Sequence, residues 1–298
     1  MTTPADRPAR LTVGVISAGR VGAVLGAALA RAGHRVVAVA AVSDASRRRA
    51  DALLPGVTIR PADEVATAAE LLVLAVPDDA LGPLVAGLAT AGAVRRGALV
   101  AHTSGAHGVR ILDPLTEVGA LPLALHPVMT FTGTEVDLAR LDGAAFGVTS
   151  DEVLRPVAET LVLEMGGEPS WIAEELRALY HAGLAFGANQ LVTLVAQSAE
   201  LLSAAGVEAP QRMLGPLLGA ALDNALRSGD RALTGPVARG DSGTVTTHLR
   251  TLAQRAPEAV DAYVAMSRLT AGRALAAGLL DVDAAAQLLD ALATRPQP

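Results

Sequence analysis

The chain has 298 residues and 51% hydrophobic content, which is enough for one large domain or two of ordinary size around a substantial core. It contains no cysteine, and all 24 basic residues are arginine; disulfides, thiolate nucleophiles, cysteine-bound metals and any mechanism that needs a lysine are therefore excluded. The net charge of −6, without a basic tract, argues against nucleic acid as a partner.

No window of the chain reaches the roughly 18 uncharged apolar residues that a membrane-spanning helix needs. Residues 1–10 also lack the long apolar core of a signal peptide. We therefore expect a cytoplasmic protein with no membrane partner.

Short apolar runs alternate with helical segments through the first half of the chain. They predict buried strands at residues 11–16, 34–43, 71–77, 98–104, 121–127, 144–150 and 168–172. Buried strands separated by helices are typical of a parallel sheet that is covered on both faces. The predicted fold class is α/β, with an N-terminal Rossmann domain built on a mainly parallel, doubly wound sheet and an all-helical C-terminal domain.

The pattern changes after Ile172, where strands give way to helices. Helical periodicity predicts helices at residues 174–206, 210–228, 244–254, 257–277 and 282–293. We expect a Rossmann dinucleotide-binding domain at residues 1–172 and an all-helical substrate and dimerisation domain at residues 173–298. Leucine and alanine on several faces of these helices favour a homodimer.

The stretch VISAGRVG, residues 15–22, matches most of a dinucleotide-binding turn between a strand and a helix. Gly19 would let the backbone approach a pyrophosphate, and Gly22 would let the helix pack closely on the strand. Ser17 replaces the first glycine, which is tolerable if its backbone angles avoid the regions that only glycine occupies. An ordinary strand-to-helix turn is the alternative. The predicted cofactor-binding residues of this turn are Ser17, Ala18, Gly19, Arg20, Val21 and Gly22.

The residues after the second strand distinguish NAD from NADP, because an acidic side chain there holds a ribose 2′-hydroxyl and an arginine holds a 2′-phosphate. Ser43, Ser46 and Arg47 favour NADP. Asp44 would support NAD, although it equally well caps the next helix, and the arginines at 47–49 can also be a solvated helix face. We expect NADP, with NAD the less favoured cofactor.

Residues at the ends of three further strands are expected at the carboxyl edge of the sheet, where cofactor and substrate gather. An ordinary Ser-Gly turn and a buried strand histidine are the alternatives for two of these places. His102 and His107 show no zinc-like spacing, so we expect no metal site. The predicted cofactor contacts are Val76, Pro77 and Asp78, and the predicted substrate contacts are Ser104, Gly105, His126 and Pro127.

The first 170 residues resemble the 6-phosphogluconate-dehydrogenase-like superfamily, in which a Rossmann domain precedes an all-helical domain. More narrowly, four motifs resemble a Rossmann-like family whose helical half is a domain of unknown function, DUF2520. These motifs are HTSGAHG (102–108), LHPVMTF (125–131), YHAGLAFGANQ (180–190) and TGPVARGD (234–241). The resemblance implies an oxidoreductase distantly related to ketopantoate reductase and pyrroline-5-carboxylate reductase.

In that superfamily the first helix after the Rossmann domain presents a lysine, and an asparagine four positions later, to the substrate carbonyl. The resemblance places Arg177 and His181 at those positions, with Asn189 two further turns along. Arg177 could orient a carbonyl or a carboxylate, but it is a poor proton donor because arginine stays protonated. His181 is the candidate general acid, since imidazole titrates near neutrality; a packed tyrosine–histidine pair is the alternative.

The loop TGPVARGDSGTV, residues 234–245, carries two further candidates in the helical half. Arg239 would clamp an anionic substrate through paired hydrogen bonds, and Asp241 would hold that guanidinium in place. Equally, Asp241 or Ser242 could serve only as the N-cap of the next helix.

Together these observations predict an NADP-dependent reductase of a small carbonyl or imine compound that carries a carboxylate, bound in a cleft between the domains. Ketopantoate is the first candidate substrate and a cyclic imine is the second, both by family analogy. The competing prediction is a regulatory or scaffold protein that binds NADP without turnover, because Ser17 and the missing lysine both depart from the family pattern. A nucleophilic hydrolase is excluded, since the chain has no Gly-x-Ser-x-Gly elbow.

Overall fold

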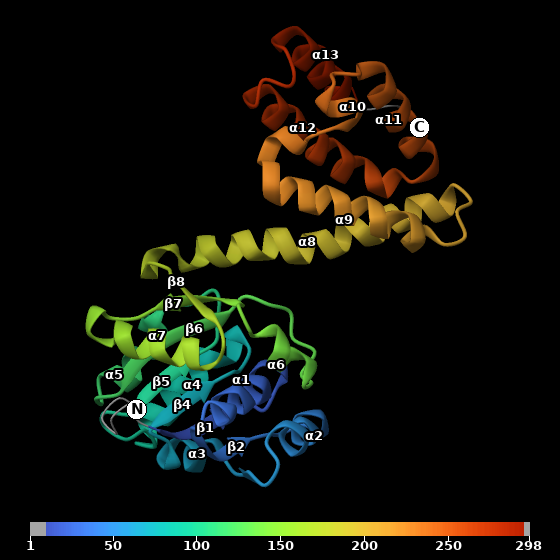
Figure 1. The fold of residues 1–298 in the computed structure, drawn as a ribbon. Helices are drawn as coiled ribbons and strands as arrows, with labels where there is room; N and C mark the ends of the chain where they lie inside the picture. Colours follow the sequence, from blue (N-terminus) through green and yellow to red (C-terminus); the bar gives the residue numbers. More distant parts are fainter. Residues whose placement is uncertain (1–9, 295–298) are drawn as a thin grey trace, which may run out of the picture. The chain divides into compact units, whose positions relative to one another are not determined.

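The structure of the protein, a computed structural model, describes residues 10–294 (Figure 1). Residue contacts divide the chain into two compact units, of which unit 1 ends at Ala185 and unit 2 begins at Phe186. The division falls inside the long helix α8 (Arg177–Ala204). The first residues of α8 therefore belong to unit 1, and its remainder belongs to unit 2.

Unit 1 is built on an 8-stranded sheet with the strand order β3-β2-β1-β4-β5-β6-β7-β8. Strands β1 to β6 run parallel, β7 is antiparallel to β6, and β8 is parallel to β7. The order from β3 to β6 is that of a Rossmann fold, so the predicted class is confirmed. The strands are β1 (Thr12–Ile16), β2 (Arg35–Ala40), β3 (Thr58–Ile59), β4 (Leu71–Leu74), β5 (Leu99–His102), β6 (Leu121–Pro127), β7 (Ala145–Thr149) and β8 (Glu168–Trp171).

Both faces of this sheet are covered by helices. Alternate residues of β4 belong to different cores: Leu71 and Val73 pack with α1, α2 and α7, whereas Leu72 and Leu74 pack with α3, α4 and α5. The helices of unit 1 are α1 (Arg20–Arg31), α2 (Asp44–Leu53), α3 (Ala62–Ala68), α4 (Asp78–Thr90), α5 (Asp113–Thr116), α6 (Val136–Arg140) and α7 (Arg155–Glu164).

Strand β3 is the element of the sheet that the sequence did not predict. It has only 2 residues, Thr58 and Ile59, and both are exposed, so no apolar pattern marks it. The second and third predicted strands are also shorter than expected, because β2 ends at Ala40 and β4 ends at Leu74. The residues that follow them form the loops at the carboxyl edge.

Unit 2 is helical, and its core is formed by apolar residues of α10 to α13, among them Leu249 and Leu288. The helices at 210–228 and 282–293 have their predicted bounds, and the short helix α10 lies within the TGPVARGD motif. Among residues 10–294 no helix is long and apolar enough to cross a membrane. The helices that follow α8 are α9 (Pro210–Ser228), α10 (Gly235–Ala238), α11 (Ser242–Arg255), α12 (Val260–Ala276) and α13 (Val282–Ala293).

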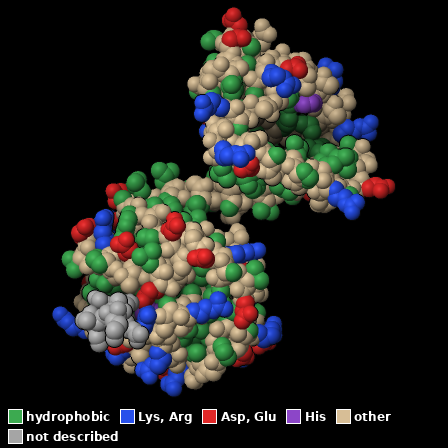
Figure 2. Space-filling view, viewed as in Figure 1, with side chains coloured by type: hydrophobic (Ala, Val, Ile, Leu, Met, Phe, Trp, Pro, Cys, Tyr) green, Lys and Arg blue, Asp and Glu red, His purple; other side chains and the backbone are tan. Residues whose placement is uncertain are grey.

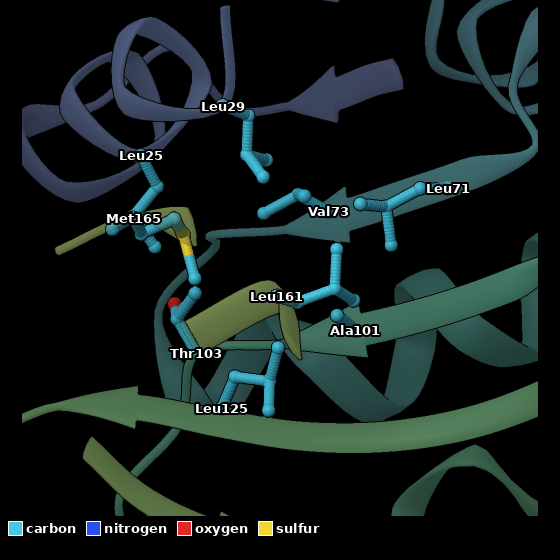
Figure 3. A pocket seen from close by; sticks show the side chains of 9 residues that line it. All are labelled: Leu25, Leu29, Leu71, Val73, Ala101, Thr103, Leu125, Leu161 and Met165. Atoms are coloured by element: carbon cyan, nitrogen blue, oxygen red, sulfur yellow. The ribbon is translucent and has the colours of Figure 1, made fainter. Parts of the chain in front are cut away.

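A small gap of about 10 Å³ lies inside unit 1, between the sheet and helices α1 and α7 (Figure 3). Apart from Thr103, its lining side chains are apolar. A buried water needs about that much room and at least two polar partners. The gap is therefore a packing defect of the core and not a ligand site. Its lining residues are Leu25, Leu29, Leu71, Val73, Ala101, Thr103, Leu125, Leu161 and Met165.

Candidate active site

Ser17 occupies the most constrained position of the turn between β1 and α1. Its φ is +76°, in the left-handed region, and it is the non-glycine residue of the described chain with positive φ. Ser17 thus adopts a φ that favours glycine, which bears on the condition stated for its tolerance in the turn. The turn is held by two amides, because the N–H groups of Ser17 and Ala18 donate to the carbonyl of Ala40 at 3.1 and 2.9 Å.

The first turn of α1 forms a cradle of free amides. The first helical hydrogen bond runs from Ala23 N–H to the carbonyl of Gly19 at 3.2 Å, so the N–H groups of residues 19–22 have no acceptor within the helix. A Cβ at Gly22 would lie 2.1 Å from the carbonyl oxygen of Ser17, so only glycine fits there. At Gly19 the nearest atom to such a Cβ is Ser17 Oγ at 3.3 Å, which leaves the approach open. This arrangement fits a dinucleotide pyrophosphate.

The residues after β2 form the N-terminal cap of α2. Ser43 Oγ accepts a hydrogen bond from Ser46 N–H at 3.1 Å, and the buried Ser46 hydroxyl donates to the carbonyl of Ser43 at 2.7 Å. The Ser46 hydroxyl is thus used within the cap. Asp44 is the first residue of the helix, and the Arg47 side chain is exposed. The Ser43 hydroxyl is used within the cap too, because it also donates to Ser46 Oγ at 3.1 Å. Arg47 therefore remains the group that can face a bound phosphate.

The loop after β4 leads directly into α4 at the same edge of the sheet. Pro77 occupies the N-cap position of α4, and Asp78 is its first residue. Both are exposed, whereas Val76 before them is half-buried. The predicted cofactor contacts of this loop are therefore accessible at the carboxyl edge.

The HTSGAHG motif forms a closed loop at the end of β5. His102 Nε2 lies 2.8 Å from the carbonyl of Gly108, and its Nδ1 accepts a hydrogen bond from Ser104 N–H at 3.2 Å. Burial lowers the pKa of His102 to about 4, so the ring is neutral at pH 7. Ser104 Oγ accepts from the N–H groups of Ala106 and His107, both at 3.2 Å. Ser104 therefore organises the turn, which is the alternative interpretation of this position.

Arg177, the first residue of α8, is buried, with only 1% of its surface exposed. Its Nε donates to Thr149 Oγ1 at 2.7 Å, and one terminal nitrogen donates to the carbonyls of Ala124 and Gly147 at 3.1 and 3.0 Å. The guanidinium thus faces strands β6 and β7, which differs from the substrate-facing place expected for it. Its contacts join the start of α8 to the sheet.

His126, Tyr180 and His181 come together beside Gly105, at the carboxyl edge of the parallel strands. His126 Nδ1 lies 2.8 Å from the Tyr180 hydroxyl, and the two rings meet edge to face. The His181 ring is nearly perpendicular to the His126 ring, with centroids 6.2 Å apart. A Cβ at Gly105 would lie 2.8 Å from His181 Cδ2 and 3.0 Å from His126 Nε2. Glycine at this position therefore keeps a small region open between the two imidazoles.

Burial sets the charge state of this cluster. The pKa of His126 is lowered to about 4, chiefly by burial and then by the neighbouring Arg177 and His181, so its ring is neutral at pH 7. Burial raises the pKa of Tyr180, so the phenol keeps its proton. His126 and Tyr180 thus offer neutral hydrogen-bonding groups at pH 7, with His126 held at one nitrogen by Tyr180.

Tyr180 and Gly147 were not among the predicted site residues. A Cβ at Gly147 would lie 2.3 Å from the Tyr180 hydroxyl, so this glycine makes room for the phenol on the sheet. The available signal was the position of Tyr180, three residues after Arg177 and next to His181 on one helix. Nothing in the sequence indicated that Gly147, on a strand of opposite direction, would lie under that helix.

The other candidates lie in unit 2 or at the strand ends. Pro127 is buried as the last residue of β6, and Asn189 is exposed on the part of α8 that belongs to unit 2. Asp241 caps α11, accepting from Thr244 N–H at 2.9 Å and from the Thr244 hydroxyl at 2.7 Å. Arg239 is exposed. In the described residues no group of three or more histidine or acidic side chains could hold a metal ion.

The strand order, the glycine turn and the helical second unit define a two-domain protein of the Rossmann class. Residues 1–127 match the family model of the Rossmann-like domain, and residues 144–270 match the model of a domain of unknown function, DUF2520. The chain therefore combines these two domains, as the four sequence motifs indicated. No curated protein matches the chain at a significant level.

Several solved structures share this fold. A candidate NADP oxidoreductase from Bacteroides fragilis is 24% identical, with a TM-score of 0.73, and the match covers 88% of this chain and 98% of that one. An imine reductase from Pseudomonas sp. is 22% identical, with a TM-score of 0.65 over 95% of this chain and 100% of that one. A reductive aminase from Aspergillus terreus, in complex with NADPH and ethyl levulinate, is 17% identical, with a TM-score of 0.60 over 94% and 99% of the two chains.

Proposed function

We propose that the protein is an NADP-dependent oxidoreductase that reduces a small carbonyl or imine compound. One observation carries this proposal: the free amides of α1 and the imidazoles of His126 and His181 lie at the same, carboxyl edge of the parallel strands. In open α/β sheets this edge is where ligands bind. The names of the imine reductase and of the NADPH-bound aminase, which share the fold, support the same class of reaction.

The residues proposed to hold the cofactor lie in the first turn of α1 and after strands β2 and β4. The amides of residues 19–22 would bind the pyrophosphate, Val76, Pro77 and Asp78 would line the adjacent strand end, and Arg47 would bind a 2′-phosphate. Bound NADPH would supply the hydride. The preference for NADP over NAD rests on the exposed Arg47 guanidinium, since Ser46 is used within the cap.

His181 is the general acid in this proposal. Its ring borders the open region at Gly105 and makes no hydrogen bond to another described residue, so its nitrogens are available to a substrate. It would protonate the alkoxide or amide anion that forms when hydride adds to the substrate carbon. Arg177 would act as a positioning residue, because its contacts fix the helix that presents His181.

The substrate we propose is a small keto acid, such as ketopantoate, or an imine. The imine alternative gains support from the named activities of two structures with this fold. Asn189 and Arg239 are exposed on unit 2, and the Arg239 guanidinium is of the kind that binds carboxylates. Asp241 has a sufficient explanation as the cap of α11.

The deciding experiment is NADPH oxidation by the full chain against a panel of 2-keto acids, ketopantoate and cyclic imines. Turnover of any member supports the proposal, and His181→Ala should then lower kcat by about 10²–10⁴ with little change in NADPH affinity. Tight NADPH binding without turnover would favour a regulatory protein instead. If calorimetry detects neither NADPH nor NADH binding, the cofactor assignment fails.

We also propose that the protein forms a homodimer through unit 2. Several large apolar side chains of that unit are exposed on α8 and α9, and Figure 2 shows apolar side chains on this surface. Phe186 is 56% exposed, Val192 70% and Leu226 80%. Soluble monomers rarely expose extended apolar patches, and a second copy of the same surface would cover them.

A further inference from the structure

The two ring nitrogens of His126 have different surroundings. Nδ1 is 2.8 Å from the Tyr180 hydroxyl, whereas Nε2 makes no hydrogen bond to another described residue. Within residues 10–294, every buried side-chain nitrogen or oxygen has a hydrogen-bond partner. His126 Nε2 must therefore be accessible, and the virtual Cβ of Gly105, 3.0 Å away, marks the side to which it points.

The direction of the His126–Tyr180 hydrogen bond follows from the protonation states together with the partners of the phenol. Tyr180 is a protonated phenol, because burial raises its pKa, and His126 is neutral with a pKa of about 4. Among the described residues the Tyr180 hydroxyl has one hydrogen-bond partner, His126 Nδ1, so the phenolic O–H has no other acceptor there. His126 Nδ1 is the acceptor within 2.8 Å. A neutral imidazole that accepts at Nδ1 carries its proton on Nε2.

The charged and titratable groups around the ring agree with a neutral His126. Arg177 lies under Tyr180, with its guanidinium carbon 5.7 Å from the phenol ring centroid, and His181 stands against His126 at 6.2 Å. Both disfavour a positive charge on His126. Asp78 favours the charged ring and so raises the pKa of His126, but its effect is the smallest of these.

We propose that Tyr180 fixes His126 as the Nε2–H tautomer, and that His126 donates this N–H to the carbonyl oxygen or imine nitrogen of the substrate. When hydride adds to the carbon, the π electron pair moves to the oxygen or nitrogen, and the Nε2–H hydrogen bond stabilises the developing charge. His126 keeps its proton throughout, and the proton that completes the product comes from His181. His126, on β6, is thus the uncharged hydrogen-bond donor that polarises the substrate, and His181, on α8, is the general acid. This inference rests on the proposed reductase function.

The tautomer can be measured without substrate or cofactor. The chain has 6 histidines, so ¹⁵N-resolved NMR of the full-length protein at pH 7 can assign each ring, using His126→Gln to identify the His126 signals. We expect a protonated Nε2 and an unprotonated Nδ1 in the wild-type His126 ring, and loss of this single tautomer in Tyr180→Phe. A wild-type Nδ1–H tautomer, or a ring that titrates near pH 7, overturns the proposal even if Tyr180→Phe does not fold.

A second tyrosine–histidine pair provides a matched control. His248 Nδ1 lies 2.8 Å from the Tyr263 hydroxyl in unit 2, with nearly the same edge-to-face geometry. Tyr263→Phe removes the same hydroxyl from the same kind of pair. It should change the signals of His248 and leave those of His126 as in the wild type.

Turnover measurements test the donor role separately. The amide nitrogen of glutamine can occupy the place of His126 Nε2 and donate there, whereas that of asparagine lies nearer the place of Nδ1. We expect His126→Asn to lower kcat by about 10²–10³, as for loss of one donor to a developing negative charge, and His126→Gln to recover part of that loss. Equal loss in both variants would overturn the donor role. Absence of turnover in the wild type would instead count against the reductase proposal and leave the tautomer result standing.

Discussion

At the scale of single residues, Ser17 holds a conformation that its side chain disfavours. A left-handed backbone costs an L-residue about 1–2 kcal/mol, whereas glycine adopts it freely at an entropic cost of about 0.5–1 kcal/mol. We therefore predict that Ser17→Gly raises the free energy of unfolding by about 0.5–1 kcal/mol, measured by urea denaturation. Ser17→Ala keeps the Cβ at φ +76° and should give no such gain. Equal stabilities of the two variants would show that the turn relaxes around any side chain.

A second prediction at the scale of single residues concerns Arg47 and the choice between NADP and NAD. A hydrogen bond to a charged group contributes about 1.5–3 kcal/mol, so Arg47→Ala should weaken NADPH binding by about 10–100-fold and leave NADH binding nearly unchanged, as measured by calorimetry. Arg35→Ala is the control, because Arg35 is exposed at the opposite end of β2. Equal weakening of NADPH and NADH by Arg47→Ala would remove Arg47 from the 2′-phosphate site.

At the scale of elements, one buried carboxylate holds the loop between β6 and α6. Asp137 is fully buried and accepts hydrogen bonds from the N–H groups of Gly133 and Thr132, at 2.7 and 2.8 Å, and from the Thr132 hydroxyl at 3.0 Å. A Cβ at Gly133 would lie 2.9 Å from Arg20 Cγ and 2.7 Å from Arg49 Nε. The loop therefore packs beside the first residue of α1, at the edge where the cofactor is proposed to bind.

Asp137→Asn should destabilise the protein in a pH-dependent way. Burial alone would raise the pKa of Asp137, but the donated hydrogen bonds outweigh it and the net pKa lies below the ordinary value. A carboxylate whose pKa is lower in the folded than in the unfolded protein stabilises the fold fully at pH values above the unfolded-state pKa, about 3.9. This stabilisation is lost as the pH falls through the folded-state pKa. At pH 7 the variant should lose about 2 kcal/mol or more of unfolding free energy.

The urea-denaturation difference between wild type and Asp137→Asn should shrink when the pH is lowered below the unfolded-state pKa. Asp142→Asn, at an exposed carboxylate of the same region, is the matched control and should have nearly the wild-type stability at both pH values. A difference that stays constant with pH would mean that the geometry of the loop, and not the charge of Asp137, provides the stability.

The elements that the sequence predicted well are those marked by a local signal. The apolar run at 121–127 and the periodicities at 210–228 and 282–293 have the bounds seen in the structure. Strand β6 is buried over most of its length, and Pro210 and Gly229 mark the two ends of α9. The site was less predictable. The approach of Tyr180 to His126 depends on Arg177 binding carbonyls of β6 and β7, which are contacts between distant segments. No local pattern encodes such contacts, and the backbone angle of Ser17 is likewise set by the hydrogen bonds to β2.

At the scale of the whole molecule, the exposed apolar residues of unit 2 predict the oligomeric state. We expect sedimentation or light scattering to give twice the 30.1 kDa mass of the chain. Val192→Asp, at a residue of α8 that is 70% exposed, should shift this equilibrium toward the monomer, because the interface would bury an unpaired charge. Val153→Asp provides the control: Val153 is 87% exposed in unit 1, so the dimer should persist. A wild-type monomer at micromolar concentration would contradict the homodimer proposal and leave the apolar surface of α8 and α9 to another partner.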